Sequence, residues 1–163
     1  MQSVIQIRLF EEEFKDAVAT LILPIQREEF GIDITLDKQP DLSDIASFYQ
    51  QGKGNFWVAV NGDDVVGTIS LKDIGNDNCA LRKMFVHKDF RGSQFGAARS
   101  LLKTALQWAK EKDVKSIYLG TTPKFLAAHR FYEKNEFEEI SEDALPSGFP
   151  LMSVDKKFYR YSL

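Results

Sequence analysis

Residues 91–97 form the stretch with the clearest chemical capacity in this sequence. The segment reads Arg-Gly-Ser-Gln-Phe-Gly-Ala and stands between an apolar run and an amphipathic run with helical spacing. The first N–H groups of a helix lack intrahelical acceptors, and the helix dipole is positive there, so such a turn binds phosphate without a metal. Lys88, Arg91 and Arg99 can add charge-assisted hydrogen bonds. The pattern predicts a ligand that bears phosphate or pyrophosphate.

The histidines and the cysteine carry less information about chemistry. Two His and one Cys are too few for a usual zinc site, so we expect no metal. His87 lies in the turn and has the chemistry of a base, although an anion contact or a surface position fits it better. We expect His129 on a helix surface. Cys79 reads as a strand residue, with the nucleophile of a two-step transfer as the alternative.

Length and composition fit one soluble domain over residues 1–163. Hydrophobic residues make up 44% and charged residues 28% of the chain, which is enough to bury an ordinary core. The formal net charge of −3 is unlike that of a protein that coats nucleic acid. The longest apolar run, 17–25, is broken by Thr20 and Pro24 and is too short to cross a bilayer. With one cysteine and no signal-type segment, we expect a cytoplasmic protein without a membrane or nucleic-acid partner.

Hydrophobic periodicity predicts the elements that position the turn. Strands are expected at 4–10, 56–60, 65–72, 76–86, 116–120, 137–140 and 154–161, and helices at 11–29, 41–51, 95–111 and 124–135. Pro24 should kink or split the first helix, and Gly31 should end it. Asp41 or Ser43 should cap the second helix.

The order of these elements predicts a fold of the α/β class (α+β mixed). The turns at Asn61-Gly62 and at 75–78 are typical of hairpins, so the three strands that they join should be antiparallel. Two later strand-helix-strand units imply parallel or crossover pairing. We therefore expect a central mixed, mostly antiparallel sheet of about seven strands flanked by about four helices.

Two motifs resemble those of the GCN5-related N-acetyltransferase superfamily. The first is Arg/Gln-x-x-Gly-x-Gly/Ala, to which Arg91 and Gly96 correspond, while Gln94 replaces the central glycine. It follows the strand LRKMFVHKDF, which resembles the run that leads into the family motif. The second motif, AHRFYEKNEF, resembles the family pattern A-x-x-F-Y-x-K-x-G-F at Ala128, Phe131, Tyr132, Lys134 and Phe137. Glu136 stands where glycine is usual, and Phe125 where asparagine is frequent.

The resemblance implies the N-acetyltransferase fold and acetyl-CoA as co-substrate, without a metal. The pyrophosphate would lie on the backbone amides of Arg91, Gly92, Ser93, Gln94, Phe95, Gly96 and Ala97, with Phe125 and Ala128 also beside the cofactor. The strand Met84-Phe85-Val86 would splay from its neighbour and pair with the pantetheine arm like an added strand. The Met84 N–H would then polarise the thioester carbonyl and stabilise the oxyanion.

Tyr132 matches the family tyrosine that donates a proton to the departing thiolate. A phenol with a pKa of about 10 can protonate a thiolate of comparable basicity with little penalty. The base does not follow in the same way, because many family members place a Glu near the position of Ala80 or Leu81, where this chain has no carboxylate. Glu28, Glu29, Asp33 or a chain of waters could replace it.

The acceptor would be held between the first helices and the loop 145–152. We expect its contacts among Glu28, Glu29, Phe30, Asp33, Phe149 and Tyr159. The predicted function is acetyl transfer to a primary amine of a small-molecule, peptide or protein acceptor, by direct attack in a ternary complex. A non-catalytic acyl-CoA-binding or regulatory module on the same fold is the alternative, and a homodimer is compatible with the family.

Overall fold

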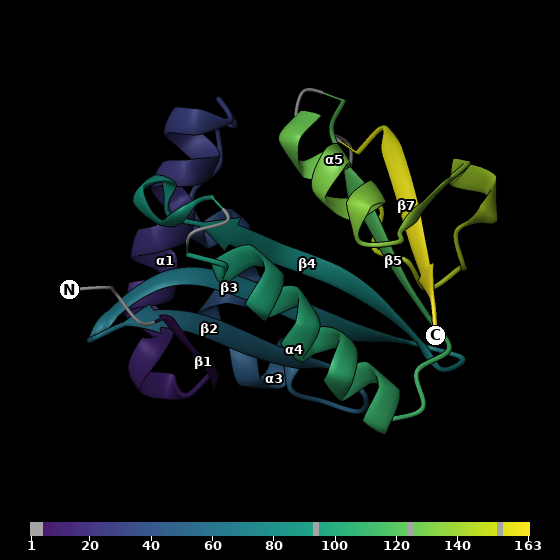
Figure 1. Ribbon diagram of the computed structural model, residues 1–163, viewed down its shortest axis with the longest axis horizontal. Helices are drawn as coiled ribbons and strands as arrows, with labels where there is room; N and C mark the ends of the chain where they lie inside the picture. The colour runs from purple at the N-terminus through teal and green to yellow at the C-terminus, as the bar shows by residue number, and fades with distance from the viewer. Residues whose placement is uncertain (1–4, 93–94, 124–125, 153–154) are drawn as a thin grey trace.

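A mixed sheet forms the centre of the structure, a computed structural model that describes residues 5–92, 95–123, 126–152 and 155–163. Its strands are β1 (Ile5–Leu9), β2 (Asn55–Asn61), β3 (Asp64–Gly75), β4 (Asn78–Val86), β5 (Ser116–Thr121), β6 (Glu138–Ile140) and β7 (Lys157–Ser162). They form one 7-stranded sheet in the order β1-β2-β3-β4-β5-β7-β6 (Figure 1). Within it β4 and β5 are parallel and the other neighbours antiparallel. The predicted mixed, mostly antiparallel sheet is confirmed.

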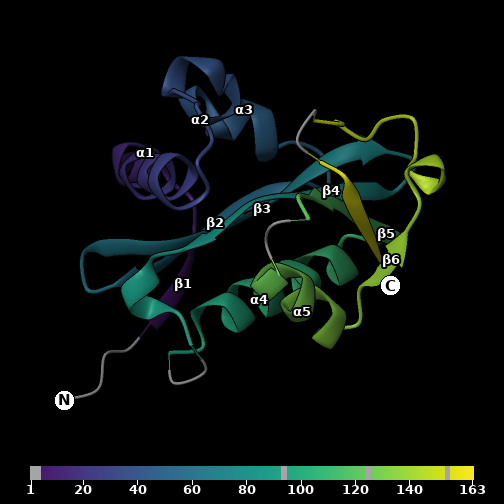
Figure 2. The same ribbon diagram turned by 90° about the horizontal axis from the view of Figure 1, so that it is seen from above.

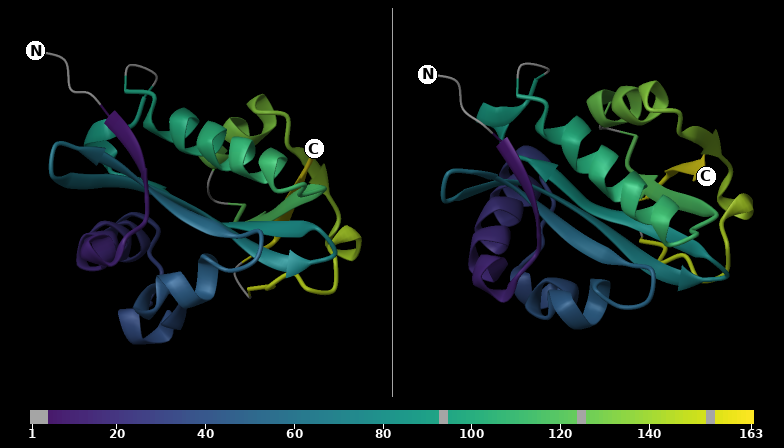
Figure 3. Two further views of the ribbon diagram at one scale, coloured as in Figure 1. Left: turned by 90° about the horizontal axis from the view of Figure 1, so that it is seen from below. Right: turned by 60° about the horizontal axis from the view of Figure 1, so that its bottom comes forward.

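Helices cover both faces of this sheet. The α-helices are α1 (Lys15–Pro24), α2 (Pro40–Ser43), α3 (Ile45–Tyr49), α4 (Ala97–Glu111) and α5 (Leu126–Lys134). Shorter helical turns are η1 (Glu12–Phe14), η2 (Ile25–Glu29), η3 (Leu36–Lys38), η4 (Lys88–Phe90) and η5 (Glu142–Ala144). Figures 2 and 3 show α1, α2 and α3 on one face and α4 and α5 on the other.

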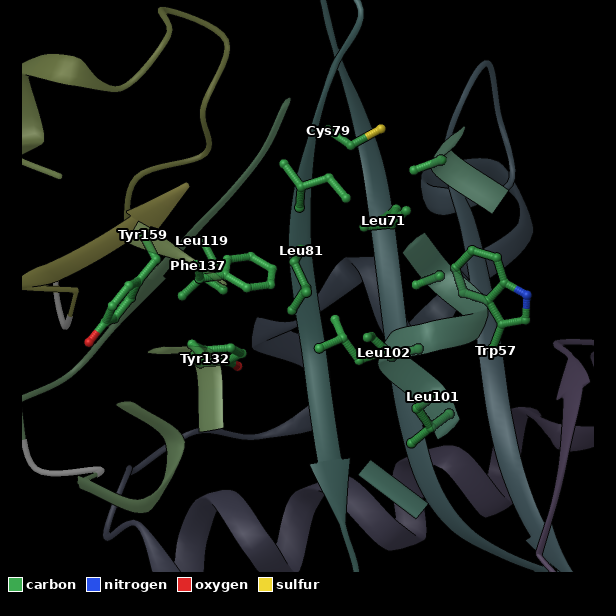
Figure 4. Packing of buried hydrophobic residues seen from close by; sticks show 14 of the residues in the cluster. Trp57, Leu71, Cys79, Leu81, Leu101, Leu102, Leu119, Tyr132, Phe137 and Tyr159 are labelled. Carbon is green, nitrogen blue, oxygen red and sulfur yellow. The ribbon is translucent and has the colours of Figure 1, made fainter. Parts of the chain in front are cut away.

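Each face of the sheet has its own apolar cluster. Because successive strand residues point to opposite faces, β2 supplies Trp57 to the cluster under α4 and α5, and Phe56 to the cluster under α1 and α3. Both side chains are almost fully buried, with exposed fractions of 3% and 0%. Figure 4 shows part of the first cluster, which includes Leu81 of β4 and Tyr132 of α5. Tyr132 thus belongs to the core as well as to the predicted site.

The two predicted hairpins are confirmed. Asn61 pairs with Asp64, with Gly62 at φ 63° in the turn between them. The turn from β3 to β4 places Asn76 and Asp77 at φ 55° and 63°. Asn and Asp tolerate this left-handed conformation better than other residues with side chains, which is why the turn forms there.

The first predicted helix, 11–29, is one helical stretch whose hydrogen-bond pattern changes along its length. It is divided into η1, α1 and η2, and α1 ends at Pro24 as expected of a residue that lacks an N–H donor. After Pro24 the chain widens into a π turn, in which the Phe30 N–H donates to the Ile25 carbonyl at 3.1 Å. Gly31, at φ 65°, follows this turn. The π turn matters for function because it brings Gln26 and Phe30 to the wall of a cavity.

The second predicted helix, 41–51, is divided as well. Asp44, with φ −146° and ψ 70°, separates α2 from α3, and its side chain accepts a hydrogen bond from the Ser47 N–H at 3.3 Å. Asp44 is therefore the cap, and the predicted caps Asp41 and Ser43 were wrong. Asp41 is instead buried, with an exposed fraction of 4%.

The last strand enters the sheet at a position that local sequence did not predict. β7 lies between β5 and β6, so the second strand-helix-strand unit is parallel but not adjacent. β7 begins at Lys157, later than the predicted 154–161, although the Lys156 N–H already donates to the Thr121 carbonyl at the end of β5. As a consequence, Asp155 lies outside the strand, next to the end of β5.

Candidate active site

The strands β4 and β5 separate in the middle of the sheet. They pair only at Asn78–Ala80 with Ser116–Tyr118, and then diverge (Figure 1). A cavity of about 760 Å³ lies in the gap, between Leu81–Val86 of β4 and Leu119–Thr121 of β5. Its other walls come from both faces of the sheet, from the π turn on one side and from α5 on the other. The cavity therefore connects the two layers of helices through the sheet.

A β-bulge interrupts β4 where it borders this cavity. Thr68 pairs with Phe85 and Ser70 with Arg82, so two steps along β3 oppose three steps along β4. Lys83 takes up the extra residue with a φ of 50°. The Thr68 hydroxyl donates to the Lys83 carbonyl at 2.7 Å, and the Ser70 hydroxyl donates to the Arg82 carbonyl at 2.6 Å. Two buried side chains of β3 thus hold the bulge in place.

The bulge removes Met84 from the hydrogen-bonding register of the sheet. Met84 has no Cα partner on β3, and β5 has already diverged at this level. Phe85 and Val86 pair with β3 on one side, so the edge of β4 that faces β5 is open from Leu81 onward. This is the geometry that an added extended ligand requires. The role of the Met84 N–H as oxyanion donor stays a prediction.

Two of the described residues in the turn before α4 lie in the left-handed region. Gly92 has a φ of 107° and Gly96 a φ of 66°. The Phe95 and Gly96 N–H groups donate to the Gly92 carbonyl at 3.2 and 3.4 Å, and the Ser100 N–H donates to the Gly96 carbonyl. Ala97 precedes that first bond of the helix, so its amide stands at the positive end of the dipole. Ser93 and Gln94, and with them the effect of the replaced glycine, lie outside the described residues.

Arg91 is held in two ways beside the cavity. Its Nε donates to the Val86 carbonyl at 2.9 Å, and its Nη1 lies 2.7 Å from Glu29 Oε1. Glu29 was predicted on the acceptor side, but it is the ion-pair partner of the predicted phosphate turn and does not line the cavity. Arg91 and Gly92 do line the cavity, as does Ala128 of α5. Phe125 is outside the described part of the chain.

Tyr132 lies at the inner end of the cavity. Its ring packs 5.5 Å from the Phe137 ring and 5.9 Å from the Tyr159 ring, and the three stand together on the β5 side of β4 (Figure 4). Its hydroxyl is 4.0 Å from the Met84 Sδ, a weak acceptor. Burial raises the pKa of Tyr132 to about 12. The phenol is therefore protonated at neutral pH, and its O–H is oriented toward the β4 bulge.

Several predicted acceptor residues do not lie at the cavity. Tyr159 is fully buried, its hydroxyl donates to Glu133 at 2.6 Å, and it does not line the cavity. Phe149 packs edge-on against Phe158 and does not line the cavity. The remaining two predicted carboxylates, Glu28 and Asp33, do not line it either, whereas Phe30 does.

The histidines and the cysteine have structural partners. His129 is buried rather than on the surface, because its Nε2 lies 2.9 Å from the Thr122 carbonyl oxygen. His87 Nδ1 accepts a hydrogen bond from the Asp89 N–H at 3.1 Å, which caps η4. Burial raises the pKa of Cys79 to about 12, so a thiolate nucleophile is disfavoured there. Among the described residues, no cluster of three or more His, Cys, Asp or Glu side chains could hold a metal ion.

Asp155 is the site residue that sequence reasoning missed. It is the one carboxylate among the described residues that line the cavity. Its side chain lies against Gly120 of β5, where a Cβ would stand 2.6 Å from Asp155 Oδ2. Burial raises the pKa of Asp155, although a hydrogen bond from the backbone of Met152 and the charge of Arg82 oppose the shift. No local pattern singles out this residue, since it depends on where β7 enters the sheet.

Comparison with known proteins agrees with this geometry. The sequence model of the Acetyltransferase (GNAT) family matches residues 20–137. An acetyltransferase of the GNAT family from Staphylococcus aureus Mu50 has a similar crystal structure, with 40% identity, a TM-score of 0.92 and coverage of 98% of this chain and 99% of that one. The chain belongs to the GNAT acetyltransferase family, as the two motifs predicted.

Other proteins share parts of this similarity. N-acetylaspartate synthetase of Xenopus tropicalis is 38% identical over 124 residues, which cover 74% of this chain and 45% of that protein. The chain spans about half the length of the curated relatives that it matches. The PaiA N-acetyltransferase of Thermoplasma acidophilum, solved in complex with coenzyme A, shares the fold at 16% identity and a TM-score of 0.75, with full coverage of both chains. Of the helices in the described residues, none has the length and apolar character to cross a membrane.

Proposed function

We propose that this chain is an acetyl-CoA-dependent N-acetyltransferase that acts on a primary amine by direct attack in a ternary complex. The observation that carries the proposal is the cavity at the β4–β5 split, which joins the open edge of β4, Tyr132 and the turn at Arg91. The thioester would enter along β4 from the side of α4 and α5. The amine would enter from the side of α1 to α3, so both substrates fit at the same time.

The β4 bulge would position the reacting carbonyl. The Met84 N–H, which has no register partner, would donate to the oxyanion that forms when the amine attacks. Tyr132 would protonate the sulfur as the C–S bond breaks. Its hydroxyl lies close to the Met84 side chain, so the acid and the oxyanion donor are next to each other. This proximity supports a collapse of the tetrahedral intermediate in which the C–S bond breaks and the sulfur is protonated in the same step.

Asp155 would remove the proton that the ammonium group loses before attack. An ordinary primary ammonium has a pKa near 10.4, so a base must assist at neutral pH. A carboxylate whose pKa is raised by burial is a stronger base than one in water. Asp155 replaces Glu28, Glu29 and Asp33 in this role, because these three do not line the cavity.

The acidity of Tyr132 still suits proton transfer to the departing thiolate. A phenol with a pKa of about 12 is a weaker acid than the sequence alone suggested. Apolar surroundings also raise the pKa of a thiol, as they do for Cys79, which reaches about 12. A thiolate released beside Tyr132 would be similarly basic, so the proton transfer would remain close to balanced.

The acceptor would be a small primary amine. The Xenopus relative is named for the synthesis of N-acetylaspartate, an acetylated amino acid, and this name favours a small molecule over a protein. The walls on the acceptor side include Gln26, Phe30 and Ile32.

A screen for amine-dependent thiol release tests this function. The purified chain is mixed with acetyl-CoA and a library of amines, and thiol release is corrected for hydrolysis. At least one amine should raise the rate, and Tyr132→Phe should lower it while coenzyme A binding by calorimetry stays within about twofold. Binding of coenzyme A without stimulation by any amine would instead favour the acyl-CoA-binding module.

A further inference from the structure

Two consecutive cations of β4, Arg82 and Lys83, line the acceptor side of the cavity. In a regular strand, neighbouring side chains point to opposite faces of the sheet. Here the Arg82 guanidinium lies 5.5 Å from the centre of the Phe48 ring in α3, and the Lys83 Nζ lies 3.6 Å from Asp41 in α2. Both side chains are thus on the α1–α3 face, because the left-handed Lys83 of the bulge takes up one extra residue.

Lys83 is the buried member of the pair. Its side chain is 8% exposed, and its Nζ donates to Gln39 Oε1 at 2.7 Å beside the Asp41 carboxylate. Gln26 and Gln39 bond to each other at 2.9 Å, and the Tyr49 hydroxyl donates to Asp41 at 2.6 Å. Burial lowers the pKa of Lys83; the charge of Asp41 opposes this shift, and that of Arg82 adds to it. An ammonium has three N–H donors, and these two partners leave one for a ligand.

Among the described residues, Arg82 has no carboxylate within ion-pair distance, although its charge acts on Asp155. The ion pairs of the described residues compensate Lys83 with Asp41 and Arg91 with Glu29, but none of them includes Arg82. Its Nη2 lies 4.0 Å from the Met152 Sδ, which is a weak acceptor. The Phe48 ring fixes one face of the guanidinium and leaves its N–H edge available.

Among the described side chains that line the cavity, cations outnumber carboxylates. Asp155 is the carboxylate of the cavity wall, and it would take up a proton when the amine is activated. With Asp155 protonated, the side chains of Arg82 and Lys83 would present a net positive charge to the acceptor. Such a wall attracts an anion and repels a polyamine, because a desolvated like-charge contact costs more than one in water.

We propose that the acceptor amine carries an anionic oxygen group, which Arg82 and Lys83 bind on the α1–α3 side of the cavity. The proposal rests on the function proposed above and names the class of its acceptor. An amino acid fits this class, with its carboxylate on the two cations and its amine toward Asp155. A phosphate-bearing amine shares the same chemistry.

Matched acceptors test the proposal with the full chain. The chain and acetyl-CoA are combined with L-amino acids and with the same amino acids in which every carboxylate is an amide. Phosphoethanolamine is compared with ethanolamine, and spermidine serves as a cationic amine. We expect kcat/KM for the best anionic acceptor to exceed that for its neutral form by about tenfold or more. Two ratios of kcat/KM are compared, that of amino acid to amide and that of phosphoethanolamine to ethanolamine. The larger ratio tells whether the site prefers a carboxylate or a phosphate. Equal use of charged and neutral forms, or preference for spermidine, would overturn the proposal.

Arg82→Gln tests the residue itself. It should raise KM for the anionic acceptor about tenfold or more, and leave KM for acetyl-CoA and for the neutral acceptor unchanged. Lys72→Gln is the matched control, since Lys72 Nζ lies 4.2 Å from the centre of the same Phe48 ring but does not line the cavity. The control should leave KM unchanged. An equal KM in Arg82→Gln and the parent chain would contradict the assignment.

The two proposals fail in different ways. If acetyl-CoA binds and no amine in the panel releases thiol, the proposed function fails. If amines are acetylated but neither the anionic group nor Arg82 affects KM, only the acceptor class is wrong. Lys83→Met adds a second test. Its thermal unfolding measures the effect of the lost ammonium on stability, and its KM measures the effect on acceptor binding.

Discussion

The Asp155 carboxylate occupies the space that the absent side chain of Gly120 leaves free. A Cβ on Gly120 would lie 2.6 Å from the Asp155 Oδ2 and 2.8 Å from its Cγ. Gly120 stands on β5 opposite Phe158 of β7, so the strand pairing brings the carboxylate to the β4–β5 split. This one relationship gives the cavity its carboxylate, and it underlies the next three predictions.

Replacement of Asp155 by Asn should remove the base. We expect kcat at pH 7 to fall by about 10²-fold, a typical contribution of a general base. The parent kcat/KM should rise with pH through a pKa above 3.8, because only the carboxylate accepts a proton, and this limb should vanish in Asp155→Asn. A variant with an unchanged pH profile would rule out Asp155.

Stability should change in the opposite direction to activity in the same variant. The pKa of Asp155 is raised in the folded state, so the folded chain holds this proton more tightly than the unfolded chain. Its contribution to stability is present below the unfolded value of 3.8 and is lost as pH rises through the folded value. At pH 7, therefore, Asp155→Asn should unfold at the same temperature as the parent chain or higher. A clear loss of thermal stability at pH 7 would argue for a structural role.

Gly120→Ala should displace the carboxylate without removing it. The added methyl group must push Asp155 aside, at a cost of about 1–3 kcal/mol typical of overpacking. We expect kcat to fall toward the value of Asp155→Asn while KM for acetyl-CoA is retained. Since both changes act on one group, the double variant should lose far less than the sum of the two effects. If the effects of the two substitutions on kcat were fully additive, Gly120 would not act through Asp155.

Tyr132→Phe should lower kcat and leave coenzyme A binding nearly intact. General acids contribute about 10²–10⁴-fold, and loss of the hydroxyl removes the proton for the departing thiolate. Burial raises the pKa of Tyr132 to about 12, so the parent chain should show no alkaline loss from this phenol between pH 9 and about 11, where an ordinary tyrosine would ionise. A fall in kcat with a pKa near 10 that disappears in Tyr132→Phe would contradict this environment.

Gly96→Ala should weaken acetyl-CoA binding through the backbone of the turn. Gly96 has a φ of 66°, and Gly62, in the turn between β2 and β3, has a φ of 63° with open space around it. Alanine at either position should cost about 1 kcal/mol of stability, since both require the left-handed conformation. Only Gly96→Ala should raise KM for acetyl-CoA, because Gly96 precedes the first amides of α4. Equal KM values in the two variants would exclude this turn from binding.

Much of the fold could be predicted from the sequence because its signals are local. Apolar runs, alternating with polar residues in the first strand, predicted all seven strands to within three residues at each end. The hairpin turns followed from Asn, Asp and Gly in positions that need a positive φ. The errors came where tertiary contacts outweigh local preference. Asp41 resembles a helix cap in the sequence. In the structure it is buried beside Lys83, because a buried ammonium needs a carboxylate partner.

By itself, the sequence determined the family and the cofactor side of the site. Motifs such as the turn at Arg91–Ala97 and the helix of Tyr132 are contiguous, so their residue types and spacing are visible before folding. Only the tertiary structure decided which side chains form the proposed acceptor side. Asp155 meets Gly120 because β7 inserts beside β5, and Arg82 and Lys83 share a face because β4 bulges against Thr68 and Ser70. Strand order and register depend on contacts between distant segments, and no local pattern of residues contains them.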